Sequence, residues 1–223
     1  LNRRSDYPKV DNKLITKQLA VSAGIAVPEL YAVVETNHDA QRLASLLAPY
    51  QDFVIKPAHG SGGEGIVVVD GRQGKLFRKA SGQLVTLASL EHHVGNILSG
   101  MYSLGGQPDH AMIEYRVRFD PLFKDITFQG VPDIRTIVFK GYPVMAMVRL
   151  PTRTSDGKAN LHQGAVGAGI NIATGVTHHG VFNSLKIDHH PDTGHPIGGH
   201  AIPQWDVLLR LAAGCYELTG LGY

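Results

Sequence analysis

The sequence predicts an α+β protein built from two lobes. Its 223 residues suffice for one large domain or two small lobes. Segments of helical and strand character alternate through the first half, whereas the second half is mostly of strand character before a final helix. We place the boundary near residue 115, which gives lobes over 1–115 and 116–223.

The composition is that of a globular protein with a neutral charge balance. Hydrophobic residues make up 43% and charged residues 18% of the chain. The net charge of +2 is far from the basic footprint of a nucleic-acid-binding protein. No window approaches the roughly 18 apolar residues of a membrane helix, and no signal-peptide core is present. The single cysteine, Cys215, excludes an intramolecular disulfide and favours the cytoplasm.

Two helices are predicted at the start of the first lobe. Asp11 is expected to cap a helix over 12–23, and Gly24 is expected to end it. A second helix is expected over 38–48, where three leucines recur.

The remainder of the first lobe is predicted to be a small sheet with one helix. We expect strands over 53–56, 66–69 and 111–117, a turn at Asp70-Gly71, and a helix over 90–99 capped by Ser89. Pro57 ends the first of these strands because it cannot donate to a ladder.

In the second lobe, strands over 134–139 and 144–150 around the turn Lys140-Gly141 predict a hairpin. A long glycine-rich loop is expected over 151–169 and a polar stretch over 178–200. The last helix, over 204–218, places Cys215 on its apolar side, which favours packing over a nucleophilic role.

Six of the twelve histidines fall within 178–200. A metal site is one interpretation. No His-Glu-x-x-His or similar spacing occurs, and no cysteine joins the histidines. We therefore favour a solvated loop and assign no metal ligand.

The strongest local motif is the glycine-rich segment 59–65 that follows Lys56. Gly60, Gly62 and Gly65 match G-x-G-x-x-G, but a β-branched strand follows them, whereas a dinucleotide fingerprint requires a helix. A Walker A lysine is absent, and a protein kinase would carry its lysine after the loop. The motif therefore predicts a flexible loop between two strands. The backbone N–H groups of this loop are expected to bind phosphates. A plain glycine-rich hairpin is the alternative, and it leaves the charged Lys56 at the end of an apolar strand unexplained.

Other polar residues admit two interpretations each. Lys13 and Lys17 lie one helical turn apart, and by themselves favour a solvated helix face. Asp133 and Arg135 share a strand face and suit ribose and phosphate binding, or a cross-strand ion pair. The glycine-rich loop around 160–169 suits the acceptor side of a cleft, or a plain surface loop.

The order of these pieces resembles that of a known superfamily. Segments 11–13, 24–28 and 53–57 with the glycine loop resemble the first half of an ATP-grasp domain. Asp-Ile-Arg at 133–135 followed by Asn-Leu-His-Gln-Gly at 160–164 is similar to the RimK-type branch, the α-L-glutamate ligase-like proteins. The resemblance covers nearly the whole chain. It implies an ATP-grasp fold, with ATP held between two α+β lobes, in a chain truncated at both ends.

The resemblance also implies residue roles. ATP phosphates would be held by Lys13 and Lys56 and covered by His59, Gly60, Ser61, Gly62, Gly63 and Gly65. The resemblance implies that Glu114, Tyr115 and Val117 bind adenine and that Asp133 and Arg135 bind the ribose and phosphates. It implies a catalytic role for Arg149, Asn160 and His162.

The implied reaction is ATP-dependent ligation of a small carboxylate to an amine, which is borne by a small molecule, a peptide or a protein. Mg²⁺ is expected as cofactor, with its Asp and Glu-x-Asn ligands downstream of Tyr223. A homo-oligomer is among the options. The alternatives are a nucleotide-binding protein of this fold without ligase chemistry and a phosphotransferase. The former predicts that the metal ligands are missing downstream, and the latter predicts ADP without a new amide.

Overall fold

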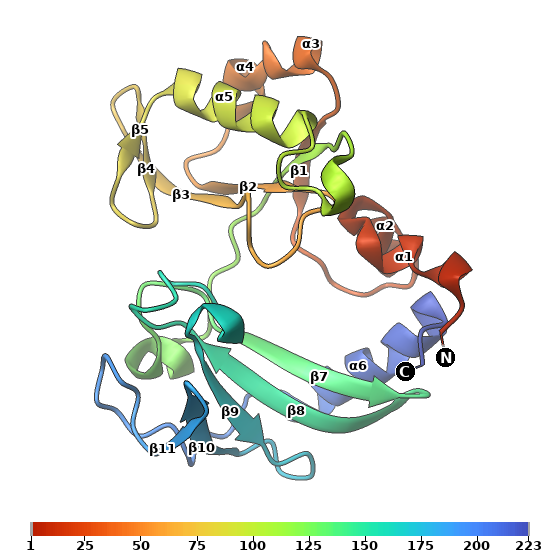
Figure 1. Ribbon diagram of the computed structural model, residues 1–223, viewed down its shortest axis with the longest axis vertical. Coiled ribbons are helices and arrows are strands. Elements are labelled where there is room, and N and C mark those ends of the chain that lie inside the picture. The colour runs from red at the N-terminus through yellow and green to blue at the C-terminus, as the bar shows by residue number, and fades with distance from the viewer. Residues whose placement is uncertain (1, 223) are drawn as a thin grey trace. The chain divides into compact units, whose positions relative to one another are not determined.

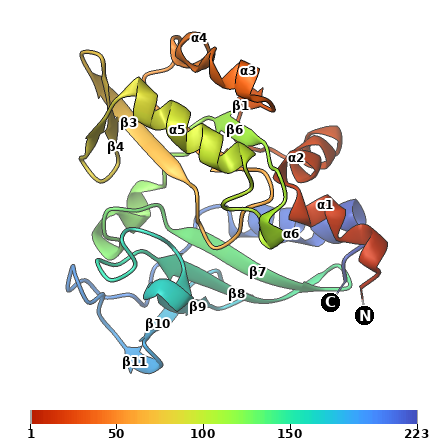
Figure 2. The same cartoon turned by 45° about the horizontal axis from the view of Figure 1, so that its top comes forward.

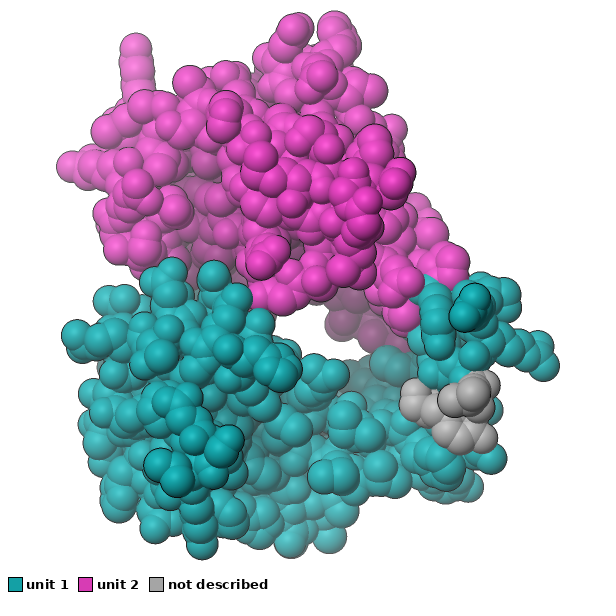
Figure 3. Space-filling view, in the orientation of Figure 1, with its two compact units in different colours: residues 1–7, 118–223 teal, residues 8–117 magenta. Residues whose placement is uncertain are grey.

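The computed structural model describes residues 2–222. The chain divides into two compact units (Figure 3), one over residues 8–117 and the other over residues 1–7 together with 118–223. The N-terminal segment joins the second unit because Asn2 Oδ1 accepts a hydrogen bond of 3.0 Å from the Gly222 N–H. The predicted boundary near residue 115 stays a prediction. Both units combine helices with an antiparallel sheet, as the α+β class requires.

A six-stranded sheet in the order β1-β6-β2-β3-β4-β5 organises the unit 8–117 (Figure 1). Its strands are β1 (Leu30–Val34), β2 (Phe53–Pro57), β3 (Val67–Gln73), β4 (Leu76–Lys79), β5 (Leu84–Val85) and β6 (Ala111–Glu114). Its helices are α1 (Pro8–Asp11), α2 (Lys13–Ser22), α3 (Asn37–Ala40), α4 (Leu43–Leu47), α5 (Leu87–Leu98) and the 3₁₀ helix η2 (Leu104–Gly106). Helix α5 lies over the sheet (Figure 2). The central strand β2 carries the chain directly into the glycine loop.

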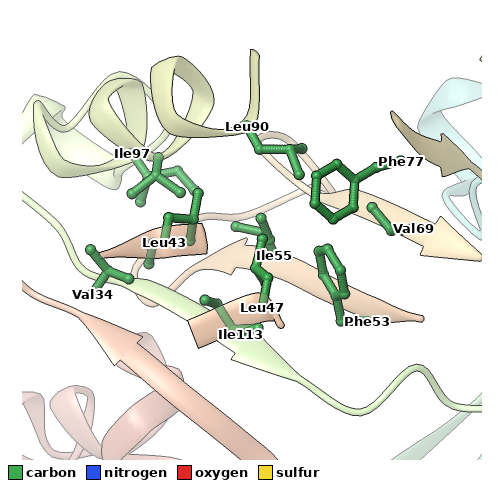
Figure 4. Close-up of a cluster of buried hydrophobic side chains, with 12 residues drawn as sticks. Val34, Leu43, Leu47, Phe53, Ile55, Val69, Phe77, Leu90, Ile97 and Ile113 are labelled. Carbon is green, nitrogen blue, oxygen red and sulfur yellow. The ribbon is translucent and has the colours of Figure 1, made fainter. Parts of the chain in front are cut away.

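The core of this unit lies between the sheet and helices α4 and α5 (Figure 4). On β2 the burial alternates, so that Phe53 and Ile55 are fully buried while Lys56 is half-buried on the opposite face. Each fully buried large apolar side chain contributes roughly 1.5–3 kcal/mol. This packing holds β2 in register and thereby sets which face of the sheet presents Lys56.

Local contacts correct the predicted start of the first helix. Asn12, and not Asp11, caps α2, because its side chain accepts hydrogen bonds from the backbone N–H groups of Leu14 and Ile15. Asp11 instead closes the short helix α1.

The helix predicted over 38–48 is two short helices. The Arg42 N–H bonds the Asp39 carbonyl at 2.9 Å, a tight i−3 contact that separates α3 from α4.

Three further boundaries of this unit differ from prediction. Asp70-Gly71 lies inside β3, and the turn comes at Gly74, whose φ of +60° suits it. Thr86, and not Ser89, caps α5, since its hydroxyl accepts from the Ser89 N–H. Strand β6 ends at Glu114 rather than at residue 117, where it pairs with Leu30, the first residue of β1, and with Val54, near the start of β2.

A five-stranded sheet in the order β11-β10-β9-β8-β7 organises the other unit. Its strands are β7 (Asp133–Phe139), β8 (Tyr142–Leu150), β9 (Val166–Ile170), β10 (Thr177–Phe182) and β11 (Leu185–Ile187). Its helices are α6 (Trp205–Thr219) and the 3₁₀ helices η1 (Arg4–Asp6), η3 (Pro121–Ile126) and η4 (Leu161–Gln163). The predicted hairpin is confirmed, and Lys140 and Gly141 form its turn with φ values of +48° and +86°.

Two segments of this unit predicted as loops contain strands. The glycine-rich stretch 151–169 ends in β9, where buried Val166, Ala168 and Ile170 alternate with glycines. The histidine-rich stretch 178–200 contains most of β10 and all of β11. In β9 the glycines occupy one face of the strand, so the sequence does not show the alternation of apolar and polar residues that is typical of a strand.

Two predicted environments are also wrong. Cys215 is exposed on α6 and does not pack in the core. His190 is buried at 1% exposure instead of solvated. Its Nε2–H donates to the Pro151 carbonyl at 3.0 Å, and its Nδ1 accepts from the Asp192 N–H at 3.3 Å.

Stability is expected to fall as the pH drops below about 6.5, in part because of His190. Burial lowers the pKa of His190, against the opposing effects of its hydrogen bond to Pro151 and the nearby Asp192. The unfolded chain therefore takes up this proton first, and His190 reduces stability at acidic pH by up to about 1.4 kcal/mol per pH unit. Urea denaturation at pH 7.5 and 5.5 measures the loss. A His190→Gln variant should lose less stability between these values, and an identical loss would contradict the assignment.

Candidate nucleotide-phosphate site

A pocket of about 120 Å³ opens beside the glycine loop of the unit 8–117. It is lined by residues of α2, β2, the glycine loop and the approach to β3: Lys13, Lys56, Pro57, Gly60, Ser61, Gly62, Gly63, Glu64 and Ile66. The structure thus brings together the two predicted lysines and most of the predicted loop. Two residues of the predicted loop, His59 and Gly65, do not line the pocket.

The loop backbone requires glycine. Gly62, Gly63 and Gly65 have φ values of +63°, +82° and +71°, which other residues rarely adopt. A Cβ on Gly65 would lie 2.6 Å from the Tyr102 ring, and one on Gly60 would lie 2.3 Å from Pro57 Cγ. Ser61 and Gly62 at its tip are exposed. The loop therefore combines a tightly packed base with an open tip.

Lys13 reaches the loop from the first turn of α2. Its backbone N–H bonds the Ala58 carbonyl at 3.0 Å, and its ammonium group donates to the carbonyls of Ala58 and Gly60. Burial lowers the pKa of Lys13, the charge of Lys56 lowers it further, and Asp109 opposes both. An arriving anion would stabilise both cations, so the pocket favours a ligand with several negative charges.

Glu114 on β6 connects the pocket-lining Lys56 to Lys17. Its Oε1 forms an ion pair with the Lys56 ammonium, and its Oε2 lies 3.2 Å from Lys17 Nζ. The side chains of Glu114 and Lys17 are only 5% and 10% exposed. Lys17, which the sequence favours as part of a solvated helix face, is instead buried against a carboxylate.

Asp109 is a buried residue that the sequence did not reveal as part of the site. Its carboxylate bonds His59 Nδ1 at 2.7 Å and accepts from the backbone N–H groups of His59 and His110 at 2.9 and 2.7 Å. It therefore holds the start of the loop. At the end of the loop, His93 Nε2 contacts the Gly65 carbonyl at 2.9 Å. Burial lowers the pKa of His93, and the hydrogen bond to the Gly65 carbonyl opposes that effect.

The predicted adenine-binding segment leaves the sheet after Glu114. Tyr115 and Val117 are exposed, but the Tyr115 N–H already bonds the Glu29 carbonyl at 2.8 Å. Arg116 Nε lies 3.2 Å from Asp52 Oδ2 and ties the segment to the start of β2.

The other unit holds the second group of predicted residues. Asp133 on β7 is directly opposite Arg149 on β8, and the two form a bidentate pair with hydrogen bonds of 2.6 and 2.5 Å. Arg135 is two residues along the same face of β7 and is exposed. The cross-strand ion pair that the sequence left open is therefore present, with Arg149 rather than Arg135 as the partner.

Asn160 and His162 belong to the loop between β8 and β9. Asn160 caps the 3₁₀ helix η4, since its Oδ1 accepts from the His162 N–H at 3.0 Å. The His162 side chain is exposed. Thr152 anchors this loop, because its buried hydroxyl donates to the Gly164 carbonyl at 2.6 Å.

Among residues 2–222, no group of three or more His, Cys, Asp or Glu side chains could hold a metal ion. In the same part of the chain, no helix has both the length and the apolar character that crossing a bilayer demands.

A family model described as sugar-transfer associated ATP-grasp matches residues 1–223. None of the curated proteins matches the sequence.

Solved structures similar to this chain are distant in sequence. D-alanine–D-alanine ligase from Bacillus anthracis is 13% identical with a TM-score of 0.49, and the match covers 98% of this chain and 52% of that one. A bifunctional glutathione synthetase from Pasteurella multocida is 14% identical with a TM-score of 0.40, over 99% and 30% of the two chains. D-cycloserine synthetase DcsG is 13% identical with a TM-score of 0.36, over 93% and 70%. This chain thus spans about half the length of the first and under a third of the second.

Proposed function

The chain belongs to the sugar-transfer associated ATP-grasp family, and on that premise we propose that it is an ATP-dependent ligase joining a carboxylate to an amine. The observation that carries the proposal is the pocket that Lys13 and Lys56 line together with the glycine loop. We also propose that the chain is similar in activity to the RimK-type branch and that the bond it forms is an amide.

The pocket suits a triphosphate on three counts. Two lysines line it, and their ammonium groups would supply point charges for phosphate oxygens. Its remaining wall is largely glycine backbone, which lets N–H groups approach an anion closely. Burial and the charge of Lys56 lower the pKa of Lys13, and a bound anion would oppose both effects.

The proposed reaction has two steps. A carboxylate oxygen attacks the γ-phosphorus, the bond to the β-phosphate bridging oxygen breaks, and ADP leaves with an acyl phosphate formed. The neutral amine nitrogen then attacks the acyl carbon, the bond from that carbon to the phosphate oxygen breaks, and the nitrogen passes its proton to the departing phosphate as the amide forms. Lys13 and Lys56 would hold the phosphates and stabilise the charge that develops during transfer.

The second group of residues has proposed roles at the ribose of ATP and on the phosphate and acceptor side. Asp133 would accept ribose hydroxyls while Arg149 holds it in place. Arg135, Asn160 and His162 would line the phosphate and acceptor side. Within residues 2–222 no group of three or more His, Cys, Asp or Glu side chains could hold a metal ion, and Mg²⁺ would enter bound to the phosphates of ATP.

The test follows phosphate release from MgATP by the full-length protein, with mass detection of products. Pools of amino acids, small carboxylic acids and amino sugars serve as substrates. We expect release that requires both a carboxylate and an amine, together with a product carrying a new amide bond.

Two results would contradict the ligase. ADP formation with a phosphorylated product and no amine requirement would identify a phosphotransferase. MgATP binding without substrate-dependent release across these pools would favour a nucleotide-binding protein without ligase chemistry.

A further inference from the structure

We infer that Lys17 is a positioning residue that holds Glu114 in place so that Lys56 can turn from Glu114 to a phosphate. The inference rests on the proposed function, since it takes the triphosphate of ATP as the ligand. It adds a third lysine to the two that line the pocket.

The three side chains come from three different elements. Lys17 lies on α2, Lys56 on β2 and Glu114 on β6. Lys56 is both a pocket-lining residue and the ion-pair partner of Glu114 Oε1. Lys17 faces the other carboxylate oxygen, at 3.2 Å from Oε2, and lies outside the pocket lining.

A buried carboxylate with one partner would trap Lys56. Glu114 is 4% exposed, and removing the only partner of such a charge costs several kcal/mol. A phosphate would have to pull Lys56 away against that cost. With Lys17 also present, Glu114 keeps a cation when Lys56 moves, and Lys56 is free to bind the ligand.

The position of Lys17 is itself held firmly. Its ammonium group donates to the Pro28 carbonyl as well as facing Glu114. Glu114 Oε2 has no well-aligned hydrogen bond, so its contact with Lys17 is mainly electrostatic. Charge at position 17 is therefore the property that matters, which distinguishes this role from ordinary packing.

The test is a double-mutant cycle on MgATP binding, measured by calorimetry with the full-length protein. Lys17→Met removes the charge at similar size and is expected to weaken binding about tenfold, equivalent to roughly 1.4 kcal/mol. In a Glu114→Gln background the same change should have less than about a twofold effect, because no buried carboxylate remains to trap Lys56.

Two further variants control for charge and folding. Lys75→Met removes a charge from an exposed turn of the same unit and should leave binding unchanged. Lys17→Arg retains the charge and should retain affinity within about threefold. Thermal unfolding verifies that each variant is folded, and Lys17→Gln replaces Lys17→Met if that variant is not.

Each outcome bears on a different claim. Equal losses in both backgrounds, or no loss from Lys17→Met, would overturn the inference while the proposed function stands. Coupling between Lys17 and Glu114 without substrate-dependent phosphate release would support the inference and count against the ligase. No MgATP binding by the unmodified protein would overturn both.

Discussion

Replacing Lys56 by alanine is expected to reduce ATP affinity by about a hundredfold or more, while the unit 8–117 stays folded. A hydrogen bond to a charged group contributes about 1.5–3 kcal/mol, and Lys56 would make such bonds to phosphate oxygens in a half-buried pocket. Folding should survive because Glu114 keeps Lys17 as its counter-charge. Calorimetry with MgATP measures the affinity, and circular dichroism during thermal unfolding reports the fold.

The matched control is Lys75→Ala, which removes a lysine charge from the exposed turn between β3 and β4. It should bind MgATP as the unmodified protein does. Unchanged affinity in Lys56→Ala would show that the phosphates are not held at this pocket, and the assignment of the site would then be wrong.

Gly130→Ala is expected to destabilise the unit formed by 1–7 and 118–223 by about 3 kcal/mol or more. A Cβ at this position would lie 1.8 Å from the Gly157 carbonyl oxygen and 2.8 Å from Pro151 Cβ. Because the nearest atom belongs to the backbone, no side-chain rotation relieves the clash. The segment before β7 must separate from the loop that carries Asn160 and His162.

Urea denaturation measures this change, and Gly214→Ala is its control. Gly214 lies within α6, and a Cβ there meets nothing within 4 Å. That substitution should leave stability unchanged or raise it by about 0.5–1 kcal/mol, since glycine weakens a helix. A loss below about 1 kcal/mol in Gly130→Ala would mean that the two backbone segments separate easily.

Local patterns in the sequence predicted much of the fold. The turn residues Lys140-Gly141 identified the hairpin, and the apolar run ending at Pro57 identified β2. The match to the family model confirms the ATP-grasp fold that the order of motifs implied. These features depend on neighbouring residues, so a single sequence carries them.

Elements whose hydrophobic periodicity is weak or misleading were predicted wrongly. Strand β9 alternates glycine with apolar residues and was expected to be a loop. The helix over 38–48 has the right composition, but one tight turn at Arg42 divides it.

The sequence by itself determined Lys56 and the glycine loop as candidates for phosphate binding, because a charged residue at the end of an apolar strand beside a glycine loop suffices for that. Lys13 became a candidate through the resemblance to the ATP-grasp superfamily. Only the tertiary structure decided that Asp109 holds His59, that His190 is buried, and that Lys17 shares Glu114 with Lys56. Lys17 and Glu114 are far apart in the chain, and nothing near either residue indicates its partner. Strand pairing and helix packing bring them together. The Lys17 ammonium group is buried as a result, and it pairs with the same carboxylate as Lys56.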